Sequence, residues 1–166
     1  MTGFEIIPKG TFKLELLAIE PCSNSTELIK VCLFYSKNQS TINSTMILKI
    51  PFDNTLSFVM RMAVLRNGKF QNNYFSATLP RACDTVKHIQ IKNWSKLTER
   101  LGAPYDCPWP AKNYSGVAYD LSDLEDFHWA TEFFYGTYKV HLEYHDKRDN
   151  VVGSVIAYIM IKRRNT

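Results

Sequence analysis

The sequence predicts a mostly β protein: a two-sheet antiparallel β-sandwich or β-cup with one short helix-bearing crossover. Three observations support this fold class. Apolar and polar residues alternate through most of the chain, polar loops separate the alternating segments, and only one segment has helical spacing. With 166 residues, 45% of them hydrophobic, and no linker-like composition, we expect a single domain over residues 1–166.

Each alternating segment predicts a strand, because successive side chains of a strand point to opposite faces of a sheet. Polar stretches between these segments predict hairpin turns, and the Asn67-Gly68 pair favours a tight one. The last segment is apolar on both faces, so we place it centrally in a sheet, covered on each side. The predicted strands fall within 11–19, 27–35, 46–50, 56–64, 75–79, 138–145 and 151–162.

One segment has helical spacing instead. Trp94, Leu97 and Leu101 fall on one face of a helix, and Gly102 followed by Pro104 provides a C-terminal stop. We expect a short helix here, with Trp94 as an anchor in the core.

The four cysteines, Cys22, Cys32, Cys83 and Cys107, predict two disulfides. No Cys-x-x-Cys pair and no Cys/His cluster with zinc-site spacing is present, so disulfides are favoured over a metal. Of the three possible pairings, we favour Cys22 with Cys32 and Cys83 with Cys107, because each pair flanks one contiguous connecting region. Each would stabilise the fold by about 2.5–3.5 kcal/mol through restriction of the unfolded chain.

Five Asn-x-Ser/Thr sequons indicate passage through the secretory pathway. Eleven asparagines are present, and chance predicts only about 1.5 matches for that number. The N-terminus lacks the apolar segment of a secretory leader, and no apolar run is long enough to span a bilayer. We therefore expect a soluble, secreted, extracellular glycoprotein whose leader has been removed. The sequons are at Asn24, Asn38, Asn43, Asn93 and Asn113.

Several function classes are disfavoured. The net charge of +4 is mild and the basic residues are scattered, so no nucleic-acid partner is expected. No phosphate loop, dinucleotide fingerprint or nucleophile elbow is present, so we expect neither an enzyme nor a bound cofactor. Acidic residues cluster within 120–126, but a solvated loop or helix start is favoured there over the paired carboxylates of a glycosidase.

The strand at 138–145 carries three side chains of the kinds that bind metals. His141, Glu143 and His145 project from one face of a strand, and two histidines with a carboxylate can bind zinc. We favour the polar face of a half-exposed strand, with no metal.

Two stretches carry a family resemblance. "CPWPAKNYSGVAYDLSDLE" at 107–125 and "YGTYKVHLEYHDKRDNVVGSVIAYIMIKR" at 135–163 resemble the C-terminal half of ganglioside-activator-like proteins. The shared order is a Cys-Pro segment, a Tyr-containing strand, an Asp-Leu step and a Gly-x-Tyr opening of the final hairpin. The front half, with its Asn-rich hairpin and long Phe/Met strand before Ala82-Cys83, is similar to four-cysteine insect relatives, including CheB-type chemosensory proteins. These groups belong to, or lie near, the ML lipid-recognition class of secreted β-cups.

This resemblance implies a cavity between the sheets for a lipid or another hydrophobic small molecule. It also implies a role in chemosensory (pheromone) perception or lipid presentation, with a receptor or a membrane surface as a further partner. The alternative is an extracellular protein-interaction module, because a filled sandwich core requires the same alternation. Met-rich and aromatic positions are the ligand-binding candidates: Phe58, Met60, Met62, Trp109, Tyr119, Tyr138, Val140, Leu142, Ile156 and Tyr158.

The sequence around Trp109 predicts where this residue lies. Pro108 and Pro110 restrict the backbone on both sides of it, and Asn113 needs exposure if it carries a sugar. A segment that runs from the interior to the surface within a few residues suits the rim of a cup, so we expect Trp109 to lie at the rim and contact the ligand.

Overall fold

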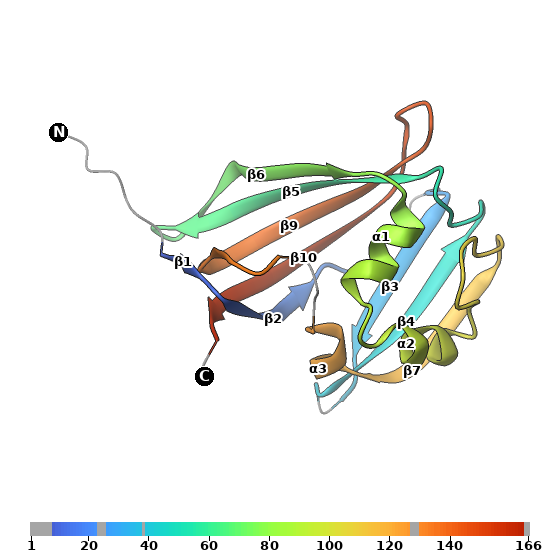
Figure 1. The fold of residues 1–166 in the computed structure, drawn as a ribbon, viewed down its shortest axis with the longest axis horizontal. Coiled ribbons are helices and arrows are strands. Elements are labelled where there is room, and N and C mark those ends of the chain that lie inside the picture. The colour runs from blue at the N-terminus through green and yellow to red at the C-terminus, as the bar shows by residue number, and fades with distance from the viewer. Residues whose placement is uncertain (1–7, 23–25, 38, 127–129, 165–166) are drawn as a thin grey trace.

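The computed structural model describes residues 8–22, 26–37, 39–126 and 130–164, and these residues form a mostly β fold (Figure 1). The strands are β1 Lys9–Gly10, β2 Phe12–Ile19, β3 Ile29–Tyr35, β4 Thr41–Leu48, β5 Ser57–Arg66, β6 Lys69–Leu79, β7 Asn113–Asp120, β8 Phe133–Phe134, β9 Gly136–His145 and β10 Val151–Arg163. The helices are α1 Ala82–Ile89, α2 Trp94–Leu101 and α3 Leu121–Leu124.

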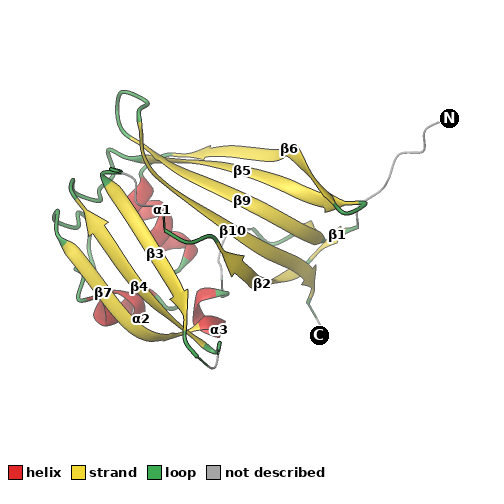
Figure 2. Cartoon of the chain, turned by 180° about the vertical axis from the view of Figure 1, so that it is seen from behind, coloured by secondary structure: helices red, strands yellow, loops and turns green. Residues whose placement is uncertain are grey.

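Two antiparallel sheets make up most of the molecule. The larger has the strand order β2-β10-β9-β5-β6, and the smaller has the order β3-β4-β7. Figures 1 and 2 show the sheets inclined to one another, with α1 and α2 lying across one face of the smaller sheet. This arrangement confirms the predicted two-sheet fold, with β10 inside the larger sheet as expected. A short pairing of β1 with β8 lies at the far end of the larger sheet.

The crossover between β6 and β7 contains the predicted helix and one more. Helix α2 begins at Trp94 and ends before Gly102, which adopts the left-handed conformation (φ +68°) that glycine favours. Helix α1 was not predicted, although Val86 and Ile89 share a face with Ala82, which is buried at its start. The single turn of α3 follows β7 in the acidic segment, where a helix start was one expectation.

Both favoured disulfides are present. Cys22 is bonded to Cys32, and Cys83 is bonded to Cys107. Because Cys83 lies in the first turn of α1 and Cys107 follows α2, the second disulfide closes the crossover that carries both helices. In the part of the chain that the structure describes, no helix is long and apolar enough to cross a membrane.

The buried residues form two clusters at opposite ends of the larger sheet. One lies beneath the helices and is rich in aromatic residues, and it includes Trp94, which is fully buried as predicted. The other surrounds Tyr138 and Phe133, where β1 and β8 lie. The candidate functional site is lined by residues of both clusters.

Candidate functional site: a cavity between the sheets

A cavity of about 350 Å³ lies between the two sheets. One wall is formed by the inner face of the larger sheet, from β2, β10, β9, β5 and the end of β6. The opposite wall comes from β3 and β4, and α1 and α2 contribute further side chains together with Leu124 at the end of α3. Nearly all of these side chains are apolar.

The register of the larger sheet explains why these side chains share one face. Met60 on β5 lies opposite Leu142 on β9, and Met62 lies opposite Val140. On the other side of β9, Leu142 lies opposite Val155 of β10. Since paired residues of adjacent strands point to the same side of a sheet, alternate residues of β5, β9 and β10 form one continuous apolar wall.

The exposure of this wall distinguishes a cavity from a filled core. Met60, Leu142 and Leu33 lie between the sheets, yet each remains only half-buried. Side chains of a close-packed core would be covered by their neighbours. The unbranched methionines also have the flexibility to adapt to bound molecules of irregular shape.

Part of the cavity wall is formed by aromatic rings. The rings of Phe58 and Tyr144 lie 5.0 Å apart, and Phe52 is 5.7 Å from Trp109. Burial, with a further contribution from Glu27, raises the pKa of the Tyr144 phenol, which further disfavours ionisation of a group that is already uncharged at neutral pH. This part of the wall therefore offers a neutral, largely apolar surface.

Six of the ten predicted ligand-binding residues line the cavity, namely Phe58, Met60, Met62, Trp109, Val140 and Leu142. The strongly alternating strands β5 and β9 supply five of these six. Their contact with a ligand remains a prediction, while their position in the wall is a feature of the fold.

The other four predicted residues lie elsewhere. Tyr138 is on the inner face but beyond the cavity, where it is fully buried and its hydroxyl donates to the Phe134 carbonyl (2.8 Å). Tyr119 is buried on β7 and does not line the cavity. Ile156 and Tyr158 are on the opposite face of β10, and the Tyr158 hydroxyl donates to Glu20 there (2.9 Å).

The placement of β10 corrects the prediction for that strand. Val155, Ala157 and Ile159 line the cavity in place of Ile156 and Tyr158. The reason is physical: β10 is apolar on both faces, so alternation gives no indication of which face is the inner one.

Trp109 also requires a correction. It is only 2% exposed and stacks on Trp94 with ring centres 5.6 Å apart, so it lies in the core and not at a rim. The segment does run from interior to surface as predicted, since Asn113 is exposed four residues later.

Three polar groups in the wall were not predicted. Gln90, at the C-terminal end of α1, is only 5% exposed, and its side-chain oxygen has no hydrogen-bond partner among the described residues. Ser44 and Glu125 also line the cavity, and Glu125 Oε2 accepts a hydrogen bond from the Leu16 backbone N–H (2.5 Å). A single glutamine between Ile89 and Ile91 carries no sequence signal that marks it as part of a wall.

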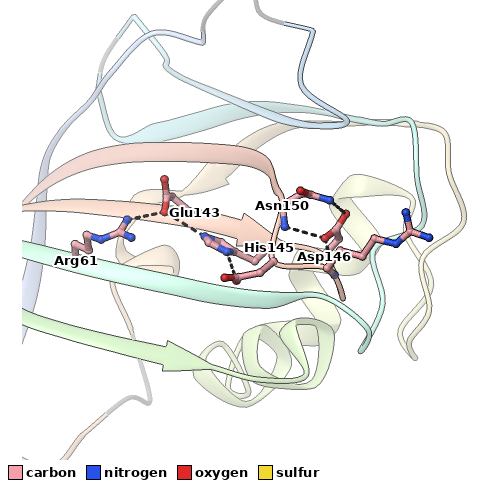
Figure 3. Close-up of polar contacts among 7 residues, drawn as sticks. Arg61, Glu143, His145, Asp146 and Asn150 are labelled. Carbon is pink, nitrogen blue, oxygen red and sulfur yellow. Dashed lines mark hydrogen bonds and ion pairs between the residues drawn. The ribbon is translucent and has the colours of Figure 1, made fainter.

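Two of the three residues of the possible metal site, Glu143 and His145, belong to an ion-pair network (Figure 3). Arg61 on β5 donates to Glu143 (2.5 Å), and His145 Nε2 lies 3.2 Å from the same carboxylate. His145 Nδ1 lies 2.8 Å from Asp149. Within the described ranges, no group of three or more His, Cys, Asp or Glu side chains has the arrangement of a metal site.

The described sequons differ in their surroundings. Asn113 is exposed, whereas the Asn93 amide donates to the Asp123 carbonyl (3.1 Å) and the Asn43 side-chain oxygen accepts from the Ala118 N–H (2.9 Å). Asn24 and Asn38 lie outside the described residues.

Comparison with known proteins assigns neither a family nor a function to the chain. No protein-family model and no curated protein sequence matches the chain. Functional reasoning therefore starts from the cavity.

Proposed function

We propose that this protein is a secreted glycoprotein that binds a lipid or another hydrophobic small molecule in the cavity between its sheets. The observation that carries the proposal is the apolar cavity of about 350 Å³. Small-molecule sites occupy roughly 300–1,000 Å³ and are lined mainly by hydrophobic and aromatic side chains. Binding would be driven by removal of apolar surface from water, both on the ligand and on the half-buried wall.

The size of the cavity limits the ligand. A water molecule in the liquid occupies about 30 Å³, and a methylene group takes up a similar volume. The cavity then holds a chain of about a dozen non-hydrogen atoms, or the end of a longer molecule.

The alternative is an extracellular module that acts through protein contacts and has a filled core. The cavity and its half-buried methionine and leucine side chains weigh against this alternative, because filling the space would stabilise such a module. Two disulfides support a protein of oxidising compartments, where such bonds persist. The more specific role, chemosensory perception or lipid presentation without catalysis, rests on the family resemblance.

The proposal is tested by filling the cavity with a large side chain. Val140 lines the cavity, so Val140→Trp should reduce binding of a fluorescent apolar probe at least about tenfold with little change in the urea unfolding midpoint. Ile156→Trp is the matched control, because Ile156 lies on the opposite face of the neighbouring strand. It should leave probe binding unchanged.

Two outcomes would contradict the proposal. One is the absence of any co-purifying apolar molecule by organic extraction and native mass spectrometry, together with no binding of the probe. The other is a Val140→Trp variant destabilised by about 1–3 kcal/mol, the cost of overpacking a filled core.

A further inference from the structure

Basic residues that are far apart in the sequence lie together at one end of the larger sheet. Figures 1 and 2 show β1, the turn between β5 and β6 and the end of β10 at this end, and the hairpin between β9 and β10 at the opposite end. The pairing of β1 with β8 also lies here. We call this part of the molecule the basic end, and it is built by residues 8–15, 64–72, 130–137 and 159–164.

The charge of the basic end differs from that of the rest of the chain. Its four segments contain seven basic and two acidic residues, an excess of five positive charges. Since the whole chain has a net charge of +4, the residues outside the basic end have a net charge of −1. The molecule therefore has one strongly positive end and is otherwise nearly neutral. The basic residues are Lys9, Lys13, Arg66, Lys69, Lys162, Arg163 and Arg164, and the acidic residues are Glu15 and Glu132.

Most of the positive charges at the basic end face solvent. Lys162 forms an ion pair with Glu15. Five other cations are exposed, and none of them forms an ion pair with a carboxylate in the described part of the chain. Neighbouring charges of one sign repel one another, so an anionic partner would be attracted to this end and would reduce the repulsion. The five exposed cations are Lys9, Lys13, Lys69, Arg163 and Arg164.

Aromatic and aliphatic side chains lie among these cations. The Arg163 guanidinium is 5.5 Å from the centre of the Tyr135 ring. In the β5–β6 hairpin, Leu65 is 39% exposed and pairs with the half-buried Phe70. Aromatic, leucine and basic side chains occur together on surfaces that lie at a membrane–water interface. A polar polyanion offers no apolar partner to an exposed leucine, so a bilayer fits this surface better.

We propose that the basic end is a docking surface for bilayers with anionic head groups, and that the tip of the β5–β6 hairpin lies at the interface. Each lysine or arginine near the bilayer increases partitioning about fivefold, and removal of Leu65 from water adds to the affinity. The uneven charge orients the molecule with the β9–β10 hairpin away from the bilayer. Docking is separate from ligand binding, because no cation of the basic end lines the cavity.

Cosedimentation of the full chain with lipid vesicles tests the proposal. The vesicles consist of phosphatidylcholine alone or of phosphatidylcholine with about 30% phosphatidylserine. At about 0.1 M salt, we expect the protein to bind the anionic vesicles at least about twentyfold more tightly than the neutral ones. Most of this binding should be lost at about 1 M salt, where charges are screened beyond about 3 Å.

Two double variants with the same change in net charge locate the docking surface. Lys13→Glu/Lys69→Glu reverses two exposed charges of the basic end and should weaken binding to the anionic vesicles at least about twentyfold. Lys147→Glu/Arg148→Glu reverses two exposed charges in the β9–β10 hairpin and should weaken it less than about threefold. Both variants should keep the wild-type urea midpoint and affinity for the apolar probe, because none of the four residues lines the cavity.

The contribution of the hairpin tip is measured at constant net charge. Leu65→Ser should weaken binding to the anionic vesicles at least about threefold, because less apolar surface leaves water on docking. The salt dependence should be unchanged, since no charge is altered.

Several outcomes would overturn the proposal. They are equal losses in the two double variants, equal binding to neutral and anionic vesicles, and wild-type binding by Leu65→Ser. Retention on heparin at salt concentrations that release the protein from vesicles would assign the basic end to a sulfated polysaccharide instead. None of these results bears on the cavity, because the experiment with Val140→Trp tests that site separately.

Discussion

At the scale of single residues, Trp109 is held by both its backbone and its ring. Its N–H and carbonyl exchange hydrogen bonds with Phe52 (2.9 and 3.0 Å), although neither residue belongs to a strand. Its ring contacts Phe52, Trp94 and Tyr114, with ring centres 5.6–5.7 Å apart. Trp109 therefore joins the loop after α2 to the core.

We predict that Trp109→Ala destabilises the fold by about 3–5 kcal/mol, because it leaves a cavity among three aromatic rings. Trp109→Phe should cost less, since it retains a ring and the described structure gives the indole N–H no acceptor to lose. Urea unfolding of both variants at neutral pH measures the difference. A Trp109→Ala protein with wild-type stability and weakened ligand binding would instead support a rim position.

At the scale of elements, alternation predicts which face of a strand points inward only where the two faces differ in polarity. On β5 and β9, charged residues such as Arg61 and Glu143 mark the outer face, so Met60 and Leu142 were correctly placed inside. On β10 both faces are apolar, and the irregular pairing between Val151 and Gly153 also affects the register. Sequence alone could not show that Val155, and not Ile156, is on the inner face of this strand.

The outer-face network across β5 and β9 has a predictable pH dependence. Burial lowers the pKa of His145, but hydrogen bonds with Asp149 and Glu143 outweigh it and raise the pKa above its ordinary 6.5. The hydrogen bond from Arg61, assisted by His145, lowers the pKa of Glu143 below its ordinary 4.5 despite partial burial. The two groups thus respond to pH in opposite directions.

The network should stabilise the fold most between pH 4.5 and pH 6.5, which are the ordinary pKa values of the two groups. The contribution of His145 is fully present below the pKa of its unfolded state and is lost as the pH rises through the higher folded value. The contribution of Glu143 is present above the pKa of its unfolded state and is lost as the pH falls through the lower folded value.

We predict that His145→Gln reduces the fall in unfolding free energy between about pH 5.5 and about pH 8.5, because this range spans the titration of the imidazole. Urea midpoints of the variant and the wild type across that range measure the effect. Asp149→Asn, which removes the hydrogen-bonded carboxylate, should flatten the curve in the same direction. Wild-type pH dependence in both variants would contradict the assignment.

At the scale of the whole molecule, the alternation of residues predicts the fold class, whereas only the family resemblance predicts the cavity. A filled sandwich and an open cup require the same alternating strands, and the difference depends on how far the sheets are held apart. Here the crossover with α1 and α2 lies at one end of the space and supplies Gln90, Trp94 and Leu97 to the wall. These are tertiary contacts, and no local pattern in the chain encodes them.

Surface exposure across the fold also separates the described sequons. Glycans are attached through the side-chain nitrogen of asparagine, which at Asn93 donates to the Asp123 carbonyl. Asn113 lies on the exposed side of β7, alternating with the buried Tyr114. Asn113 is therefore the described sequon most compatible with a sugar in the folded protein.

We predict that, after secretion from a eukaryotic host, Asn113→Gln lowers the intact mass by one glycan, whereas Asn93→Gln leaves it unchanged. Intact mass spectrometry before and after enzymatic deglycosylation makes the comparison, and the deglycosylated proteins should differ only by their substitutions. Because Asn113 does not line the cavity, Asn113→Gln should also leave the affinity for the probe unchanged. A glycan lost from Asn93→Gln but not from Asn113→Gln would show that the hydrogen bond to Asp123 does not protect Asn93.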